Sequence, residues 1–308
     1  MYAERRLDLP NSANLGHKKK VFDLFAQKVL VVVGKGGTGR TTVARVLAEL
    51  GTKTGRRVAV IAGTSGTHFL AKEDPLLSFS SLEPGQVLIS YLNEHGLGQL
   101  GKRLSSTGLA SIISTAIPGI ADLLVLAKIK QMERSDAADL IIFDAPASGH
   151  FLRLIATPKG LADIAAAGPL RKQSREVLEM LDDPTRLGVA FVTIAEETPV
   201  KESIETMKQL KKSSGIVPCA LFINSVLPSI PGNEKVQDLS FLESTSPYYQ
   251  AAKYMRTRSQ SQKHYEAMAA KAFGLKPIEV PLVPTVELSE DDITYLADIV
   301  ELQIRSKK

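Results

Sequence analysis

The sequence predicts an α/β protein whose mostly parallel sheet is covered by helices on both faces. Short apolar segments have the length and composition of buried strands, at 28–33, 58–62, 139–143, 188–194, 217–223 and 278–283. Helical stretches separate them, notably 41–50, 161–182, 200–212 and 246–272. Strands and helices that alternate along a chain are typical of three layers with a parallel sheet in the middle.

The alternation lapses twice, which indicates helical insertions. Between about 64 and 138, apolar helical pieces at 97–104, 109–117 and 120–129 are separated by glycine and proline, and a second break covers roughly 151–186. We expect both insertions on one side of the sheet, in one domain over 28–308 that follows an N-terminal extension over 1–27. Their leucines and isoleucines either line a groove for an apolar partner or, more commonly, pack against the domain's own core.

Composition excludes several classes of protein. The chain has 308 residues, 44% of them hydrophobic, and a modest net charge of +5, much of it in Lys18–Lys20 and Lys307–Lys308, so we expect no nucleic-acid partner. A single cysteine, Cys219, excludes an intrachain disulfide and a multi-cysteine metal site. No segment is as long and uniformly apolar as a bilayer span, and the N-terminus lacks a signal-peptide core. These features predict a cytoplasmic protein without stable membrane insertion.

A glycine-rich loop carries the strongest chemical signal. Residues 30–42 read LVVVGKGGTGRTT, with the spacing G-x-x-x-x-G-[K/R]-T of a Walker A phosphate loop. Glycines let backbone amides point at phosphate oxygens, and the following helix directs its positive dipole end at them. A glycine-rich turn without catalytic meaning is the alternative, which the order strand, loop, helix disfavours. We therefore expect a P-loop NTPase that binds ATP or ADP through Gly34, Lys35, Gly36, Gly37, Thr38, Gly39, Arg40, Thr41 and Thr42.

One hydroxyl group and one carboxyl group are candidate ligands for Mg²⁺. Thr41 is at the position of the hydroxyl that ligates the ion. Asp144 ends the apolar run Leu-Ile-Ile-Phe, about 100 residues after the loop, as a Walker B carboxylate does. The stretch Ala-Pro-Ala-Ser-Gly-His over 145–150 follows it and makes the assignment more specific.

These stretches resemble one family, the arsenical pump-driving and tail-anchored-protein-targeting ATPases, which have a deviant Walker A loop with a second lysine. Lys35 is that second lysine, and the sequence DAPASGHFLRL at 144–154 is the other main similarity. The likeness continues at 118–124, 196–202, 222–228 and 281–286, and it covers about residues 28–305.

The resemblance implies a homodimer or heterodimer with a paralogous ATPase, with nucleotide at the interface. Lys35 matches the signature lysine, which reaches the phosphates across the dimer and stabilises charge in the transition state. Asn224 matches an asparagine that reads adenine, and Pro284 to Val286 match a loop that closes over the base. In the targeting branch, the helical insertions form an apolar groove for a hydrophobic protein client.

The departures from the family bear on hydrolysis. Thr64 stands where the family has an aspartate that orients the attacking water, and a hydroxyl cannot replace that carboxylate. Asp74 is a poor substitute because it lies ten residues downstream. Arg40 replaces a compact ammonium with a planar fork that need not fit between the phosphates, although it keeps the charge that makes it a catalytic candidate beside Lys35. The zinc-binding Cys-x-x-Cys pair and the arsenite-binding cysteines are both missing.

Two functions remain open at this stage. The first is a Mg²⁺-dependent, dimeric ATPase switch with slow or partner-dependent hydrolysis. The second is a non-hydrolysing regulatory subunit that binds nucleotide and pairs with a catalytic paralogue. A cell-division or plasmid-partition ATPase would share Lys35, but the insertions and the 144–154 stretch argue against it.

Overall fold

The computed structural model describes residues 24–63, 74–82, 84–94, 99, 119–227 and 245–305. Within these ranges seven strands form one sheet in the order β3-β2-β4-β1-β5-β6-β7, and every neighbouring pair is parallel. The strands are β1 (Val29–Gly34), β2 (Val58–Ala62), β3 (Leu77–Ser81), β4 (Leu140–Asp144), β5 (Leu187–Ile194), β6 (Ala220–Val226) and β7 (Ile278–Pro281). The predicted three-layer α/β architecture is confirmed.

Strand β1 is the centre of the sheet and is buried along its whole length. Its side chains alternate between two hydrophobic cores, with Val29, Val31 and Val33 on one face and Leu30 and Val32 on the other. An apolar β-branched run buried on both faces is what a central parallel strand requires. The carboxyl end of β1 therefore presents the glycine-rich loop from a rigid position.

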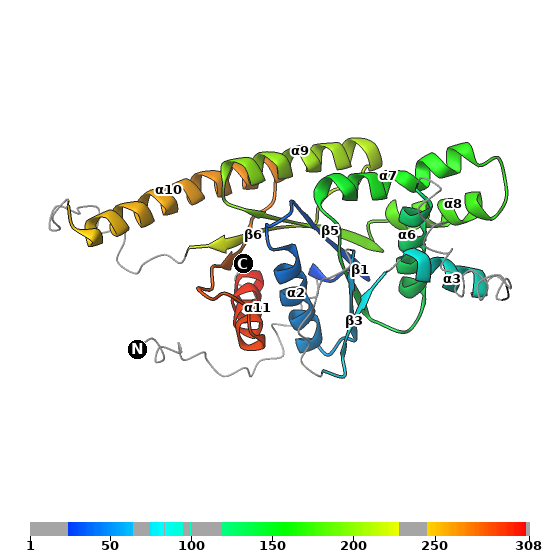
Figure 1. Ribbon diagram of the computed structural model, residues 1–308, viewed down its shortest axis with the longest axis horizontal. Helices are drawn as coiled ribbons and strands as arrows, with labels where there is room; N and C mark the ends of the chain where they lie inside the picture. Colours follow the sequence, from blue (N-terminus) through cyan, green and yellow to red (C-terminus); the bar gives the residue numbers. More distant parts are fainter. Residues whose placement is uncertain are drawn as a thin grey trace.

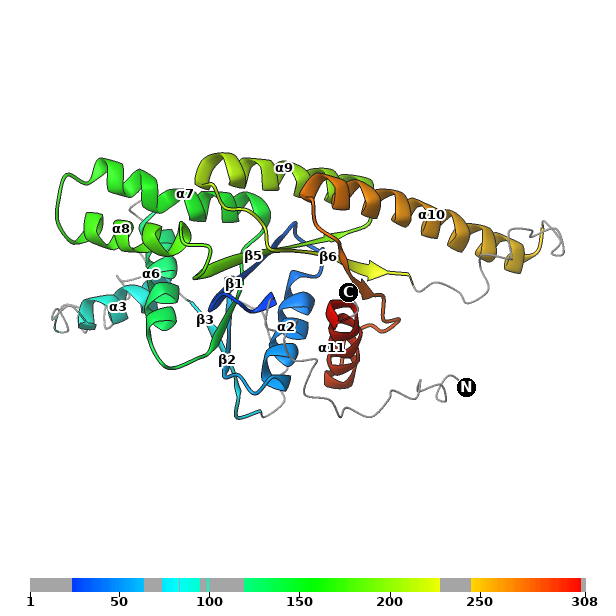
Figure 2. The same cartoon turned by 180° about the vertical axis from the view of Figure 1, so that it is seen from behind.

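Helices cover both faces of the sheet (Figures 1 and 2). Helices α2 (Arg40–Lys53) and α11 (Glu290–Arg305) pack on one face. On the other face lie α7 (Ser148–Ile164), α9 (Glu197–Ser214) and α10 (Pro247–Phe273). The view in Figure 1 shows that α10 extends beyond the sheet at the end opposite to α8.

The described helices of the two insertions gather on the α7 side, as predicted. Helices α3 (Pro84–Glu94), α6 (Ile120–Arg134) and α8 (Pro169–Leu181) lie together at one end of the molecule (Figure 1). The expected helical pieces at 97–104 and 109–117 lie outside the described residues, apart from residue 99.

Two predicted elements were wrong in detail, and one strand was not predicted. The helix expected over 161–182 is two helices, because α7 ends at Ile164 and α8 begins after Gly168, whose φ is +95°. The first insertion contains an edge strand, β3, whose half-exposed polar sequence LSFSS lacks the apolar run of a buried strand. Strand β6 begins at Ala220 instead of 217, since Pro218 has no N–H to donate to the sheet.

Helix α2 packs closely against the sheet at a glycine inside the helix. Its apolar face, formed by Val43, Val46, Leu47 and Leu50, is fully buried. Gly51 lies inside the helix, which ends at Lys53. A Cβ on Gly51 would come within 2.7 Å of Cγ2 of Val58, so the missing side chain allows the close approach between helix and strand.

Ordered packing begins before residue 28. Phe25 is buried in the core on the α2 side, and its carbonyl accepts a hydrogen bond from Nη1 of Arg56. The guanidinium of Arg56 also lies 5.8 Å from the centre of the Phe25 ring, a cation–π distance. This aromatic anchor joins the start of the described chain to the domain.

Among the helices that the structure describes, none has the length and apolarity needed to cross a bilayer.

We predict that Glu266→Gln is more favourable for stability at pH 8 than at pH 5, when the variant is compared with wild type at each pH. Burial, together with the nearby carboxylate of Glu279, raises the pKa of Glu266 from 4.5 to about 7. A raised carboxyl pKa means that the folded state binds more protons than the unfolded state between these values, so stability is lost as the pH rises through 7. The gain at pH 8 should be at most about 1 kcal/mol, because the side chain is partly solvated.

Urea unfolding of Glu266→Gln and wild type at pH 5 and pH 8 measures this difference. Glu287→Gln, which neutralises an exposed carboxylate, is the matched control. An equal effect of Glu266→Gln at both pH values would contradict the prediction.

Candidate functional site

The candidate site lies at the carboxyl edge of the parallel sheet, where the ends of β1, β4 and β6 come together. The loop over 34–42 joins the end of β1 to the start of α2. Gly36 and Gly37 are exposed, whereas Thr38 is buried and donates both its N–H and its hydroxyl to the carbonyl of Lys35. The loop is thus closed on itself, with its glycines open to solvent in front of the N-terminus of α2. Anions bind well at such a helix end.

Asn224 holds the loop from the side of β6. Its side-chain Nδ2 donates to the carbonyl of Thr38 at 3.0 Å, and the residue is buried. Gly39 has a φ of +86°, and a Cβ there would lie 1.9 Å from Nδ2 of Asn224. The last glycine of the loop is therefore required both by its backbone conformation and by the neighbouring amide.

The strand end that carries Asn224 is itself held in an unusual conformation. Ser225 has a φ of +56°, a left-handed value that is rare outside glycine. Gln262 of α10, which is buried, donates to the carbonyl of Ser225 and accepts from the N–H of Leu227. Sequence reasoning missed Gln262, and a glutamine in the middle of a helix gives no signal that would find it.

Asp144 and Thr41, the two residues predicted to bind Mg²⁺, contact each other. The Thr41 hydroxyl donates to Oδ2 of Asp144 at 2.6 Å, and Oδ1 of Asp144 is buried without a hydrogen-bond partner among the described residues. Burial raises the pKa of Asp144, and the Thr41 hydroxyl and the Arg40 charge oppose that rise. A buried carboxylate oxygen without a partner beside a hydroxyl is a donor set that suits Mg²⁺.

Arg40 turns towards the end of β4. Its Nη1 donates to the carbonyl of Ala145, the residue after Asp144. Desolvation lowers the pKa of the Arg40 guanidinium, and the charge of Asp144 partly offsets this effect. In this structure Arg40 therefore ties the start of α2 to the segment over 144–150.

Lys35 turns away from Arg40. Its Nζ forms an ion pair with Oε1 of Glu202 at 2.6 Å, in the second turn of α9. Helix α9 lies on the sheet face opposite to α2. Glu202 falls inside the 196–202 similarity to the family, yet sequence reasoning gave it no role, because nothing in the spacing indicates that α9 approaches the loop.

The remaining predicted residues occupy the same edge of the sheet. Pro284 and Val286 lie in the segment between β7 and α11, and Val286 is fully exposed. This segment is joined to β6 by the hydrogen bond from the N–H of Leu282 to the carbonyl of Val226. Thr64 lies outside the described residues, and the Asp74 carboxylate accepts from the N–H of Leu76 in a turn before β3.

A charged cluster links the segment after Asp144 to α6. Asp122 is buried at the start of α6, and its carboxylate accepts from Nε of Arg153 at 3.2 Å. His150 lies 3.5 Å from the same carboxylate and 2.7 Å from Nη2 of Arg153. The first turns of α7 are thereby bound to the helical insertion.

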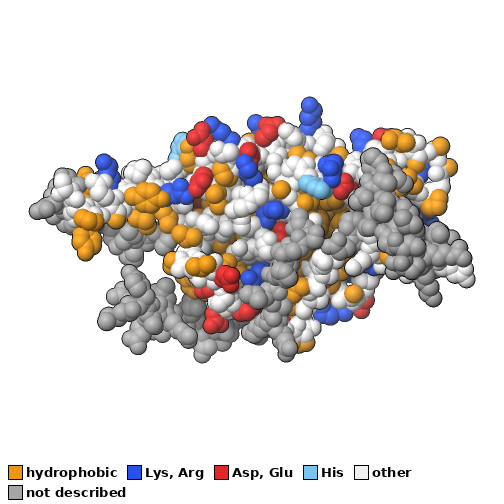
Figure 3. Space-filling view, in the orientation of Figure 1, with side chains coloured by type: hydrophobic (Ala, Val, Ile, Leu, Met, Phe, Trp, Pro, Cys, Tyr) orange, Lys and Arg blue, Asp and Glu red, His pale blue; other side chains and the backbone are white. Residues whose placement is uncertain are grey.

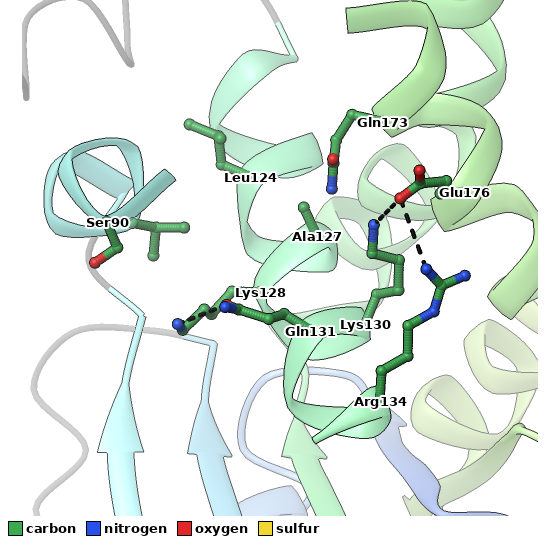
Figure 4. Close-up of a pocket in the computed structure, with 10 residues that line it drawn as sticks. Ser90, Leu124, Ala127, Lys128, Lys130, Gln131, Arg134, Gln173 and Glu176 are labelled. Atoms are coloured by element: carbon green, nitrogen blue, oxygen red, sulfur yellow. Dashed lines mark hydrogen bonds and ion pairs between the residues drawn. The ribbon is translucent and has the colours of Figure 1, made fainter. Parts of the chain in front are cut away.

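A separate hollow of about 220 Å³ lies between α3, α6 and α8 (Figure 4). Its lining mixes apolar side chains, such as Leu124 and Ala127, with the polar Lys128, Gln131 and Gln173. In the same lining, the buried Lys130 forms an ion pair with Glu176, and Arg134 lies 3.8 Å from the same carboxylate. This part of the insertions is therefore strongly charged as well as apolar.

Comparisons with known proteins are consistent with this site. A family model for anion-transporting ATPases matches residues 94–169. The chain is 29% identical to ATPase BagA of Mycobacterium tuberculosis over 243 residues, which is 70% of this chain and 69% of that protein. It is 26% identical to an arsenical pump-driving ATPase of Escherichia coli, covering 73% of this chain and 39% of that protein. It is also 24% identical to ATPase GET3B of Arabidopsis thaliana, over 66% of this chain and 65% of that protein.

We predict that Gly39→Ala destabilises the protein more than Gly37→Ala. Both glycines have positive φ values, so alanine costs roughly 1–2 kcal/mol at either position. Only at position 39 does the new Cβ meet Asn224, which should add about 1–3 kcal/mol of overpacking. The free energy of unfolding in urea measures the difference.

Asn224→Ala in the Gly39→Ala background provides the control, because it removes the amide that the new methyl group would meet. It should recover part of the lost stability. Equal destabilisation by the two glycine substitutions would show that Asn224 does not constrain the loop.

Proposed function

Because the chain is similar to anion-transporting ATPases, we propose that it is a Mg²⁺-dependent ATPase that works as a dimeric switch. Its similarity to ATPases along most of the chain supports nucleotide binding and ATPase function. We further propose that hydrolysis is slow or depends on a partner, that the chain dimerises, and that single residues have the roles given below.

The observation that carries the proposal is the pairing of Thr41 with Asp144 in front of the N-terminus of α2. Backbone amides from Gly36 to Thr41 bind the phosphates, and the helix dipole favours their negative charge. The Thr41 hydroxyl and Oδ1 of Asp144, which has no hydrogen-bond partner among the described residues, would hold the Mg²⁺ ion. The bound ion would neutralise phosphate charge.

Asn224 and the segment from Pro284 to Val286 are proposed to contact the adenine base. Both lie at the β6 side of the loop, and the exposed Val286 offers an apolar surface to a ring. One N–H of the Asn224 Nδ2 already donates to the Thr38 carbonyl, which leaves the second N–H and the Oδ1 for the base. One residue would then fix the loop and contact the nucleotide.

Slow hydrolysis is proposed from two substitutions. Arg40 stands at the lysine position of the loop and donates to the Ala145 carbonyl, so in this conformation it is bound to protein. Thr64 cannot supply the missing carboxylate. Removing one positioned catalytic group can lower the rate of hydrolysis by roughly 10²- to 10³-fold. The same two observations favour the second candidate, a non-hydrolysing subunit that pairs with a catalytic paralogue.

The proposed partner is a second copy of the chain or a paralogous ATPase. The protruding end of α10 supports a protein partner, because Tyr248 and Tyr254 are 78% and 65% exposed there. Figure 3 shows hydrophobic side chains gathered at this end of the molecule. Aromatic side chains are enriched at interfaces. A hydrophobic protein client at the insertions is a further proposal, which the apolar side chains in the hollow between α3, α6 and α8 support.

We predict that Lys35→Ala lowers ATP turnover about 100-fold or more while ATP affinity changes only a few-fold, because the lysine acts on transition-state charge. Phosphate release at saturating ATP and fluorescence titration with a labelled ATP measure the two quantities. Lys201→Ala, which removes an exposed lysine paired with Glu197, is the control.

Turnover by the pure chain that disappears in Lys35→Ala would exclude the non-hydrolysing subunit. Absence of turnover in wild type that is restored by an added paralogue would instead favour it. A wild-type chain that binds no ATP at millimolar concentration would contradict both candidates.

A further prediction concerns the ion. Thr41→Val should abolish the increase in ATP affinity that Mg²⁺ produces, because valine keeps the shape but lacks the hydroxyl ligand. Thr41→Ser retains a hydroxyl and should keep the Mg²⁺ effect. Calorimetric titration of ATP with Mg²⁺ and with EDTA measures it, and an unchanged Mg²⁺ effect in Thr41→Val would remove Thr41 from the site.

A further inference from the structure

The signature lysine of the loop is already bound within its own chain. Lys35 Nζ lies 2.6 Å from Oε1 of Glu202, and both side chains are a little over 40% exposed. The pair joins residues that are 167 positions apart in the sequence. The attraction between the two charges opposes the entropy cost of holding the flexible lysine side chain in one geometry.

The elements around the pair fix where Glu202 lies. Gly34 is in register with Val192 of β5, the strand that leads into α9. Val200 and Ser203 of α9 are buried, which places the intervening Glu202 at the edge of the packed face and beside the loop. The position of this carboxylate is therefore set by the fold.

The other acidic residues at the start of α9 have different partners. Glu196 pairs with Arg258 of α10, and Glu197 pairs with Lys201 one turn further along α9. Glu202 is the acidic residue of this region that contacts the loop. Its charge is opposite to that of Lys35 and equal in sign to that of phosphate, so Glu202 and a phosphate group compete for the same ammonium.

We propose that Glu202 is a positioning residue that holds Lys35 in the nucleotide-free chain, on the α9 side of the loop, and releases it when phosphate binds. This inference rests on the proposed function only for the identity of the competing anion, a nucleoside triphosphate. The competition sets a threshold: phosphates must displace a carboxylate before Lys35 stabilises their charge, whether they are bound by the same subunit or by its partner.

The first test examines the ion pair without any nucleotide. A lysine-reactive acylating reagent modifies Lys35 at a rate that mass spectrometry of the full chain measures. An ammonium held by a carboxylate reacts slowly, so Glu202→Gln should increase the rate for Lys35 by about three- to fivefold, the range expected for a half-exposed pair. Glu202→Asp should react at an intermediate rate.

Glu205→Gln is the matched control, because it makes the same change of charge on the same helix, at an exposed residue that bonds to Gln209. It should leave the labelling of Lys35 unchanged. An equal labelling rate in wild type and Glu202→Gln would overturn the proposal, and this result is independent of whether the chain binds ATP.

The second test measures the competition with phosphate. Glu202→Gln should tighten ATP binding by about three- to fivefold, and the gain should shrink at high salt because salt screens exposed charges. In a Lys35→Gln background the same substitution should have no effect, since the group that the two anions share is then absent. Fluorescence titration with a labelled ATP measures all four variants of this cycle.

The outcomes separate the two proposals. A wild-type chain that binds no ATP rejects the proposed function, while the labelling experiment still decides whether Glu202 holds Lys35. Normal ATP binding that Glu202→Gln leaves unchanged or weakens rejects the competition and leaves the proposed ATPase intact. An equal gain in the Lys35→Gln background would assign the effect to general charge and would also reject it.

Discussion

The site depends on the parallel pairing of β1 with β4 and β5. Val32 is in register with Asp144, and the N–H of Ala145 donates to the carbonyl of Val32. This pairing places Asp144 beside the strand that ends in the glycine-rich loop. Because parallel strands all end at one edge, Asn224 and the segment after β7 reach the same place from the other side. The geometry of the site is thus a consequence of strand order.

The sequence predicted the elements that have a strong hydrophobic period and missed those that do not. Strands β1, β2 and β4 are apolar apart from Gly34 and Asp144 at the ends of β1 and β4, and the sequence predicts their bounds within one residue. The edge strand β3 was missed because it is half exposed and rich in serine. The break between α7 and α8 was missed because a single glycine, Gly168, does not by itself interrupt the helical pattern over 161–182.

In the candidate site, too, the sequence predicted residues that belong to local motifs and missed contacts that depend on tertiary packing. Thr41 and Asp144 were identified separately from local motifs, and the structure brings them to 2.6 Å. The contacts of Lys35 with Glu202 and of Ser225 with Gln262 join distant segments through tertiary packing. No local pattern encodes such contacts, because each depends on where a helix crosses a strand end. Lys35 and Arg40, five residues apart in one loop, consequently bind groups from different layers of the molecule.

The close packing at Gly51 has a mechanical consequence. Helix α2 cannot rotate or slide on the sheet without driving its backbone into Val58 and Leu140, so the helix that starts at the loop is fixed to β2 and β4. The opposite layer contacts the loop through an ion pair between two partly exposed side chains, Lys35 and Glu202. Contacts of that kind break and reform at low energetic cost. Changes at the loop would therefore be transmitted through the α7–α9 layer, while the α2 layer serves as the stationary frame.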